Sequence, residues 1–232
     1  MCCIPAFGST KFPIEGTYPF LTESPFVIFI IYITQIYFIV QCGFCIGVDL
    51  LFAIFFLYSA AKLEMLCLEI QTVRNEGHIN SCIKKHQEII KFVDDTRDVV
   101  QFILFKTNIT MAICSICSIF PIIHESLERS FQFIFIVIAG CQRLYITACP
   151  ADDLMENSER VATEAYNILW SRKSRCIIIK NICFIIQRSQ KPLVISMGSL
   201  LPTLSLKYYA KYLMKLLSYF MTIRAIIYNL NH

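Results

Sequence analysis

Residues 25–58 read PFVIFIIYITQIYFIVQCGFCIGVDLLFAIFFLY, and Asp49 is the only charged residue among them. A helix needs about 20 apolar residues to cross the hydrocarbon core of a membrane, so this stretch is longer than one crossing. It predicts a transmembrane helix over 26–58, with a span at about 26–48 and a helical extension into the cytoplasm. The fold is therefore expected to be built around helices that cross a membrane.

The composition of the whole chain supports this interpretation. Of its 232 residues, 56% are hydrophobic and only 16% are charged, whereas a soluble domain carries about 25% charged residues. So many apolar side chains do not fit inside one globular core, because a folded domain must also present a wettable surface. The net charge is +4 without a run of like charge, which argues against a nucleic-acid-binding surface. We expect an all-α, polytopic transmembrane protein in contact with the lipid bilayer.

Three further apolar stretches predict three more spans. The second span covers 99–123, and Pro121 marks its end. The third covers 131–149 and is ended by Pro150, and the fourth covers 204–228. Four spans place both termini of the chain on the same side of the membrane.

Two long polar segments separate these spans, and both are predicted to be helical. In segment 59–98, apolar residues recur every three or four positions and define one helix face. That face consists of Ile79, Cys82, Ile83, His86, Ile89, Ile90 and Val93. In segment 150–203, Ser158 is predicted to start a helix, and a second amphipathic stretch runs from Cys176 to Gln187. The face after Ser158 consists of Ala162, Ala165, Tyr166, Leu169 and Trp170.

Lysine and arginine predict the orientation, because they concentrate in cytoplasmic loops. The two long polar segments hold thirteen such residues, against Lys11 and Arg129 on the opposite side. We therefore expect 59–98 and the anchor helices of 150–203 to be cytoplasmic. The expected extracellular parts are the loop 1–25, the turn 124–130 and the tail 229–232.

The sequence offers no set of catalytic or metal-binding residues. Most of the twelve cysteines lie in apolar runs, where cysteine packs as a small hydrophobe. Cys82 and His86 lie four residues apart, yet no further ligand is near them, which favours a buried helix face over a metal site. No nucleophile has a histidine and carboxylate beside it, and there is no phosphate-binding glycine loop. We expect no enzyme activity, no metal and no cofactor.

The last 75 or so residues carry a pattern that resembles the C-terminal part of insect odorant receptors. Its elements are Ser158, Ala165, Tyr166 and Trp170; Arg188-Ser189-Gln190-Lys191-Pro192; Leu204-Ser205-Leu206; Ser218-Tyr219-Phe220; and Arg224. Upstream, residues 82–90 resemble the family's Cys-x-x-x-His-x-x-Ile segment before its fifth helix. Tyr18-Pro19-Phe20, Ser24-Pro25 and Gln35 resemble its second extracellular loop and the start of its fourth helix.

This resemblance assigns the four spans to the family's helices four to seven. It implies a subunit of an odorant-gated cation channel in the plasma membrane of sensory neurons, detecting volatile odorants. The channel would be a hetero-tetramer with the obligate odorant receptor co-receptor. The cytoplasmic helices and the last helix would form a shared anchor, and the last span would line the pore. The anchor residues implied are Tyr166, Trp170, Arg188, Gln190, Pro192 and Tyr219.

Several features depart from the family pattern. Helices one to three have no counterpart, and Tyr145-Ile146-Thr147-Ala148-Cys149-Pro150 replaces the usual Tyr-Cys-x-x-Gly. Leu217 stands where an aromatic residue is common. The missing helices favour an alternative, a truncated and non-conducting anchor module. Such a module would assemble with receptor subunits without binding odorant.

An odorant pocket needs an apolar cavity with a few polar groups for orientation. Candidates in the outer half of the spans are Phe29, Tyr32, Ile33, Ile36, Phe133, Ile136 and Val137. Tyr32 is the strongest, because it brings a hydroxyl to a place where unpaired polar groups are costly. The alternative for each residue is ordinary helix packing or lipid contact.

The last span offers candidates for the pore. Thr222 and Ile226 resemble the family's extracellular gate and lie four residues apart, hence on one helix face. A ring of apolar side chains can gate by dewetting, although both residues could equally pack against neighbouring helices. Lys207, Lys211 and Lys215 also lie four apart. We favour a wet cytoplasmic vestibule for these lysines, where they reach water or lipid phosphate, over a position in the conduction path.

Overall fold

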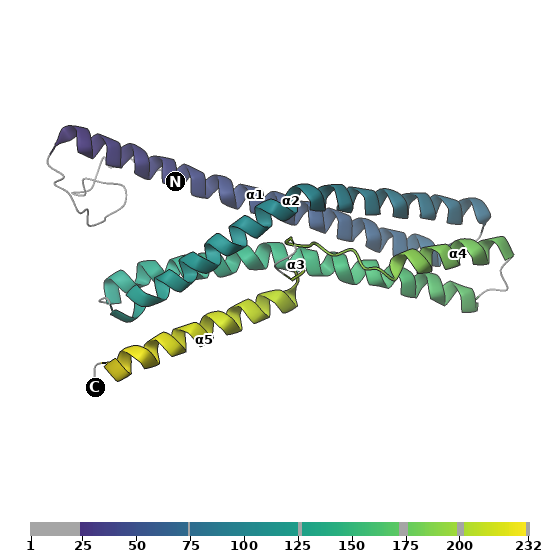
Figure 1. Cartoon of the computed structure of the whole chain (residues 1–232). Helices are drawn as coiled ribbons and strands as arrows, with labels where there is room; N and C mark the ends of the chain where they lie inside the picture. Colours follow the sequence, from purple (N-terminus) through teal and green to yellow (C-terminus); the bar gives the residue numbers. More distant parts are fainter. Residues whose placement is uncertain (1–23, 74, 125–126, 172–175, 199–201, 231–232) are drawn as a thin grey trace. The chain divides into compact units, whose positions relative to one another are not determined.

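The computed structural model describes residues 24–73, 75–124, 127–171, 176–198 and 202–230. These residues form the all-α fold that the sequence predicts, and no strand occurs among them. The helices, drawn in Figure 1, are α1 (Pro25–Gln71), α2 (Glu76–His124), α3 (Leu127–Ser171), α4 (Cys176–Ser189) and α5 (Leu206–Leu230). Nearly all of the predicted loop 1–25 lies outside the described residues, as do the last two residues of the predicted tail 229–232, whose first two belong to α5.

Three of these helices are long and apolar enough to cross a membrane, judged by length and composition. The qualifying segments are Pro25–Gln71, Glu76–Ile123 and Ser130–Asn167. Helix α5 is not among them. It has 25 residues, but three lysines and an arginine interrupt its apolar sequence. The predicted count of four spans therefore remains a prediction.

The chain divides into two compact units, Met1–Asp49 and Leu50–His232. In the first unit, the described residues from Pro25 onward form the beginning of α1. Its aromatic side chains Phe26, Phe29 and Phe44 are exposed. A helix that exposes this much apolar surface is suited to lipid rather than to water.

The second unit contains the end of α1 together with α2, α3, α4 and α5. Helix α3 packs on α2, α4 packs on both, and α5 packs on α2 and α3. In Figure 1, α4 lies beside the C-terminal end of α3, and α5 begins near the middle of α3. Most of the fully buried core lies in the parts of the helices that are predicted to be cytoplasmic. It includes Leu63, Leu66, Ile70, Ile79, Cys82, Leu154, Val161, Ala165, Ile182 and Ile185.

The predicted apolar face of segment 59–98 is confirmed, but the segment is not one helix. Ile79, Cys82, His86, Ile90 and Val93 are all buried. Helix α1 ends at Gln71 and α2 begins at Glu76. The Thr72 and Val73 amides donate to Glu69 O and Ile70 O at 3.0 and 3.1 Å, which tightens the last turn of α1.

The predicted helix start at Ser158 was wrong, because α3 continues through Pro150 and Ser158 without a break. Helix α2 likewise contains Pro121 and ends at His124, and the span ends at 123 and 149 stay predictions. Proline is tolerated in such helices because neighbouring elements satisfy the freed backbone groups. Pro150 is itself buried between Ala148 and Ala151, so packing holds the helix on both sides of the ring.

One side chain of the predicted face after Ser158 was also misplaced. Ala165 is fully buried as expected, but Tyr166 is half-exposed. The buried side of this helical stretch instead follows Leu154, Ser158, Val161 and Ala165. These residues recur at three and four positions, so they define one face of the continuous α3.

Candidate functional site

The connection from α4 to α5 is held against α3 by buried hydrogen bonds. The Leu193 amide donates to Ser158 Oγ at 3.0 Å, and Ser158 is only 2% exposed. The Leu204 amide then donates to Ile195 O at 2.9 Å, so the chain folds back on itself. Gly198 lies within this fold with φ of 80°, a conformation that glycine adopts without strain. We call described residues 190–198 and 202–205 the anchor strap.

The strap fixes the beginning of α5. Ser205 Oγ accepts a hydrogen bond from the Tyr208 amide at 3.2 Å, the geometry of a helix N-cap. Asp152 Oδ1 on α3 accepts the Leu206 amide at 3.2 Å. A carboxylate at a helix N-terminus also interacts favourably with the helix dipole. The first turn of α5 is thus tied to α3 by backbone donors that would otherwise be unsatisfied.

A second tie joins α5 to α2 one turn further along. Tyr212 Oη donates to Ser115 Oγ at 3.2 Å, and Ser115 is 1% exposed. On α3, a Cβ placed on Gly140 would lie 3.3 Å from Ser115 Oγ, so the glycine lets α3 approach closely. The Tyr145 and Tyr209 rings lie 5.5 Å apart between α3 and α5. We call Ser115, Gly140 and Tyr212 the three-helix node.

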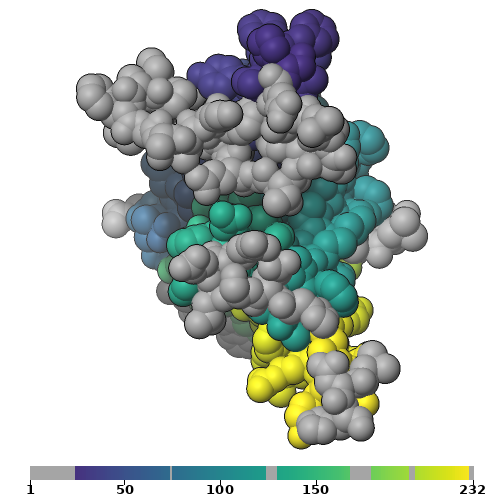
Figure 2. All heavy atoms as spheres, turned by 90° about the vertical axis from the view of Figure 1, so that its left-hand side faces the viewer, coloured from purple at the N-terminus to yellow at the C-terminus, as the bar shows by residue number. Residues whose placement is uncertain are grey.

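The remainder of α5 presents a polar stripe. Lys207, Lys211, Lys215, Ser218, Thr222 and Ile226 fall within about 100° of arc on a helix of 3.6 residues per turn. All six are exposed, whereas the half-buried Tyr212, Leu216 and Ile223 lie on an adjacent side of the helix, about 40–80° beyond Ile226. Figure 2 shows the C-terminal part of α5, in yellow, projecting at the lower edge of the view. We call these six residues the α5 stripe.

A groove of about 450 Å³ lies between α2 and α4. His86, Asp94, Phe184 and Arg188 are among the residues that line it. His86 is buried, and this burial together with the nearby Arg188 charge lowers its pKa from 6.5 to about 4. The imidazole is therefore neutral at neutral pH and acts as part of the helix face, as the sequence suggested.

The predicted odorant-site residues are divided between the two units. Phe29, Tyr32, Ile33 and Ile36 belong to α1 in the first unit, and Phe133, Ile136 and Val137 belong to α3 in the second. Within these groups, Phe29, Ile33 and Ile136 are exposed. Tyr32, Ile36, Phe133 and Val137 are partly buried. Their role as a pocket stays a prediction.

The predicted gate residues share the α5 stripe. Thr222 is exposed, and its hydroxyl donates to Ser218 O at 2.8 Å, within its own helix. Ile226 is 53% exposed. Both side chains are thus accessible in this chain, and their role as a gate stays a prediction.

The predicted anchor residues occupy several places. Arg188 is in the last turn of α4, the Gln190 amide donates to Ile186 O at 3.1 Å, and Pro192 precedes the tied Leu193. Tyr166 is half-exposed on α3, and the Trp170 side chain lies outside the described part. Tyr219 is half-exposed on α5, a helix that does not contact α4 among the described residues.

Sequence reasoning missed the residues that make the ties. The sequence does not predict the tie of Asp152 to Leu206 or that of Ser115 to Tyr212. It also does not predict the contact of Asn108 Nδ2 with Met197 Sδ on the strap, at 3.0 Å. A usable signal was present, because small and polar residues within membrane helices mark helix contacts. Gly140 and Ser115 fit that signal.

The long apolar helices define the class of protein, a multi-pass helical membrane protein. A model of the 7tm odorant receptor family matches residues 2–215, and the chain belongs to this family. It is a family of receptors rather than of enzymes. The resemblance noted in the C-terminal part of the sequence is thereby confirmed.

Individual relatives agree with this assignment. The chain is 24% identical to putative odorant receptor 65b of Drosophila melanogaster, with 78% of this chain and 48% of that receptor covered. It is 25% identical to odorant receptor Or2 of Anopheles gambiae, with coverages of 68% and 43%. The chain thus spans about half the length of the curated relatives it matches.

A solved structure shows the same fold. The insect olfactory receptor OR5 from Machilis hrabei superposes with a TM-score of 0.76 at 16% identity, covering 91% of this chain and 56% of that one. The same receptor in complex with eugenol also superposes with a TM-score of 0.76.

Proposed function

We propose that the chain acts as part of an odorant receptor subunit in an odorant-gated cation channel, assembled as a hetero-tetramer with the obligate co-receptor. Family membership supports the receptor role. Helix α5 is the proposed pore-lining element, and volatile small molecules are the proposed ligands. The similar receptor from Machilis hrabei has been solved with one small organic molecule, eugenol.

The α5 stripe carries this proposal. A helix buried in lipid on all sides would be apolar all round, whereas α5 exposes three lysines, a serine and a threonine along one side. An adjacent side of α5 packs on α2 and α3. Water along the stripe would solvate these polar groups, and subunits arranged around an axis would enclose that water. Thr222 and Ile226 would then face the outer part of the path.

The membrane placement is part of the proposal. The protein would lie in the plasma membrane, with both termini of this chain extracellular. The anchor strap and the buried core of α2, α3 and α4 would be cytoplasmic. The excess of lysine and arginine on that side supports this orientation. Phe29, Tyr32, Ile33 and Ile36 on α1 and Phe133, Ile136 and Val137 on α3 would contribute to the odorant pocket.

Recording odorant-evoked current from cells that express the chain with the co-receptor tests the proposal. We expect current that depends on both proteins and on an applied volatile such as eugenol. Thr222→Val should change ion selectivity or open probability without changing surface expression. Ser81→Ala, an exposed site on α2, is the matched control. Surface assembly without any current would contradict the channel proposal.

The anchor strap supports a second candidate, a non-conducting anchor module. The strap, α3 and the beginning of α5 are joined by the Leu193–Ser158 and Leu206–Asp152 bonds. Such a tied element could assemble with receptor subunits without binding odorant. Co-purification with the co-receptor in the absence of odorant-evoked current would favour this candidate.

A further inference from the structure

A groove of about 510 Å³ lies between the C-terminal ends of α2 and α5, both of which belong to the second unit. Its α2 side is formed by Ile123, and its α5 side runs from Met221 to Asn229. Arg224 is the one charged residue among the described residues that line it. The groove, which we call the outer groove, thus combines apolar walls with a single cation.

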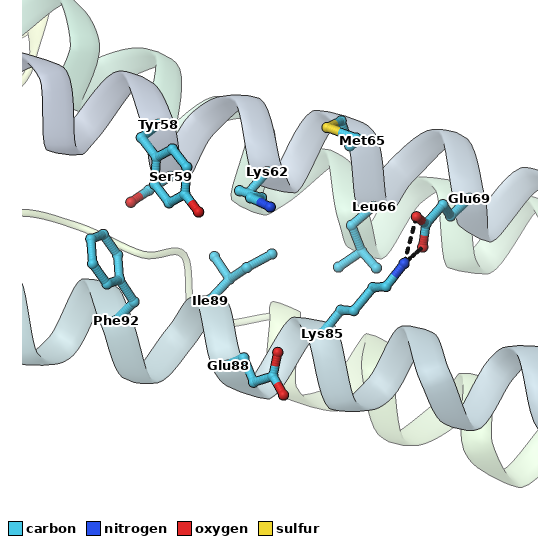
Figure 3. A pocket seen from close by; sticks show the side chains of 10 residues that line it. All are labelled: Tyr58, Ser59, Lys62, Met65, Leu66, Glu69, Lys85, Glu88, Ile89 and Phe92. Atoms are coloured by element: carbon cyan, nitrogen blue, oxygen red, sulfur yellow. Dashed lines mark hydrogen bonds and ion pairs between the residues drawn. The ribbon is translucent and has the colours of Figure 1, made fainter.

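The cavity near the beginning of α2 has a different balance of charge. Figure 3 shows this cavity between α1 and α2, where two lysines and two glutamates line it, Lys62, Lys85, Glu69 and Glu88. Lys85 forms an ion pair with Glu69 at 2.6 Å. Arg224, in contrast, forms no ion pair with any described residue. The outer groove is therefore complementary to an anion.

Arg224 lies on a side of α5 that faces neither the proposed pore nor the packed core. Around the helix axis, it lies about 160° from both Thr222 and Ile226 of the α5 stripe. It also lies about 80–100° from the half-buried Leu216 and Ile223. In the proposed membrane placement, this third side of α5 meets lipid.

The rest of this third side is suited to lipid. Its other large side chains fall within about 80° of arc together with Arg224, and all of them are exposed, namely Leu213, Leu217, Met221 and Tyr228. Arg224 is the only charged residue within that arc. An arginine on a lipid-facing side is costly unless its side chain reaches the polar headgroup layer.

The depth of the outer groove matches the outer edge of the membrane. Ile123 is the last residue of the predicted second span and Tyr228 is the last of the predicted fourth, so two separately predicted span ends meet in one groove. Arg224 precedes Tyr228 by four residues, and so it lies about 6 Å inside the hydrocarbon core. An arginine this close to a helix end extends its guanidinium to the headgroup layer, where tyrosine is also favoured.

We propose that the outer groove binds the phosphate of a phospholipid in the outer leaflet. The Arg224 guanidinium would donate two parallel hydrogen bonds to phosphate oxygens, a geometry that its planar fork favours. The acyl chains would follow Met221 and Leu217, which lie deeper on the same side of α5. The inference rests on the membrane placement given under the proposed function and adds a lipid ligand to it.

Photo-crosslinking of the full chain in phosphatidylcholine nanodiscs tests the proposal. One probe is phosphatidylcholine with a diazirine on an acyl carbon close to the headgroup, and the other is diacylglycerol with the same acyl chain. The readout is labelling of residues 221–229 relative to labelling at Phe135. Phe135 is exposed on α3 and lies about 6 Å inside the same predicted edge, outside the groove. We expect a higher ratio for phosphatidylcholine than for diacylglycerol.

Two outcomes of this comparison would overturn the proposal. Equal ratios for the two probes would show that the phosphate is not recognised. A ratio that falls when water-soluble glycerophosphocholine is added would show that the ligand is a free phosphate ester and not a lipid. The readout requires neither odorant nor current, so failure of the lipid site and failure of the channel proposal give different results.

Variants of Arg224 separate this site from general lipid contact. Arg224→Gln should lower the phosphatidylcholine ratio about tenfold, the effect of losing hydrogen bonds to a charged group. Arg224→Lys should retain more of the ratio, because it keeps the charge. Lys215→Gln is the matched control, since it removes the same charge from the opposite side of the same helix. Normal labelling at Phe135 would show that each variant is inserted, and an undiminished ratio in Arg224→Gln would exclude the site.

Discussion

At the scale of single residues, the ties between helices decide how α5 is held. Ser158 is the clearest case, because its hydroxyl is the partner of the buried Leu193 amide. Ser158→Ala should destabilise the second unit by about 1–3 kcal/mol, the cost of an unsatisfied buried donor. Hydrogen exchange at Leu193 should become faster, while Ser81→Ala leaves it unchanged. Unaltered protection at Leu193 would show that the hydroxyl is not needed there.

Gly140 tests the close approach within the three-helix node. A Cβ at this position meets Ser115 Oγ at 3.3 Å, so Gly140→Leu has no room without moving α3 away from α2. We expect a loss of about 1–3 kcal/mol, as for other overpacked sites, measured by thermal unfolding in detergent. Gly43→Leu is the control, because nothing lies within 4 Å of a Cβ there. Equal melting temperatures for the two variants would contradict the tight contact.

His86 should make stability depend on pH. Its pKa falls from 6.5 to about 4 on folding, so the unfolded chain binds more protons between these values. Its contribution to stability is complete above pH 6.5 and is lost as pH falls toward 4. His86→Gln should flatten the stability profile in that window, whereas His78→Gln should not. If the stability of His86→Gln depends on pH as steeply as that of the unsubstituted chain, other titratable groups cause the pH dependence.

At the scale of helices, hydropathy was enough to predict the long apolar spans, because lipid exposure leaves a run of apolar residues that needs no tertiary information. Helix ends were harder. Pro150 and Ser158 carry signals that end or start a helix in isolation, but buried neighbours on both sides keep α3 continuous. The buried face that contains Ser158 and Val161 is set by the continuous helix. A helix that started at Ser158 would have a different buried face, and for this reason Tyr166 was predicted to lie on the buried side.

The α5 stripe yields a prediction for this whole element. If Lys207, Lys211 and Lys215 line a water-filled vestibule, they lower the local cation concentration. The triple Lys→Gln variant should then raise single-channel cation conductance about two- to fivefold at low ionic strength, with a smaller effect at high salt because of screening. Lys91→Gln on α2 is the control. Unchanged current at low salt would show that these lysines do not line the vestibule.

At the scale of the molecule, the candidate site could be predicted only in part. The stripe residues Thr222 and Ile226 follow from helical spacing along one segment, which a sequence displays directly. The ties of Asp152 to Leu206 and of Ser115 to Tyr212 join residues 54 and 97 positions apart. Such pairs arise from tertiary packing, which the spacing of residues along the chain does not predict. The odorant pocket depends on contacts of the same long-range kind.

The proposed topology can be tested by cysteine labelling in intact cells. A membrane-impermeant maleimide should label Cys2 and Cys3 from outside, whereas the exposed Cys183 on α4 should react only after permeabilisation. Cys67 and Cys82 should stay unreactive in both cases, because they are buried and burial raises the pKa of both thiols, that of Cys67 to about 11. Labelling of Cys183 in unpermeabilised cells would contradict the proposed topology and show that α4 faces the outside of the cell.

The uninterrupted course of α2 and α3 has a mechanical consequence. With 49 and 45 residues, these helices are about 74 and 68 Å long, more than twice the thickness of the hydrocarbon core. In the proposed placement, each would act as a stiff lever that pivots in the bilayer. A tilt of about 5° about the middle of the predicted span would displace the cytoplasmic end, about 46–52 Å away, by about 4–5 Å. A small rotation near the outer surface would thus arrive at the cytoplasmic side as a stroke close to the rise of one helical turn.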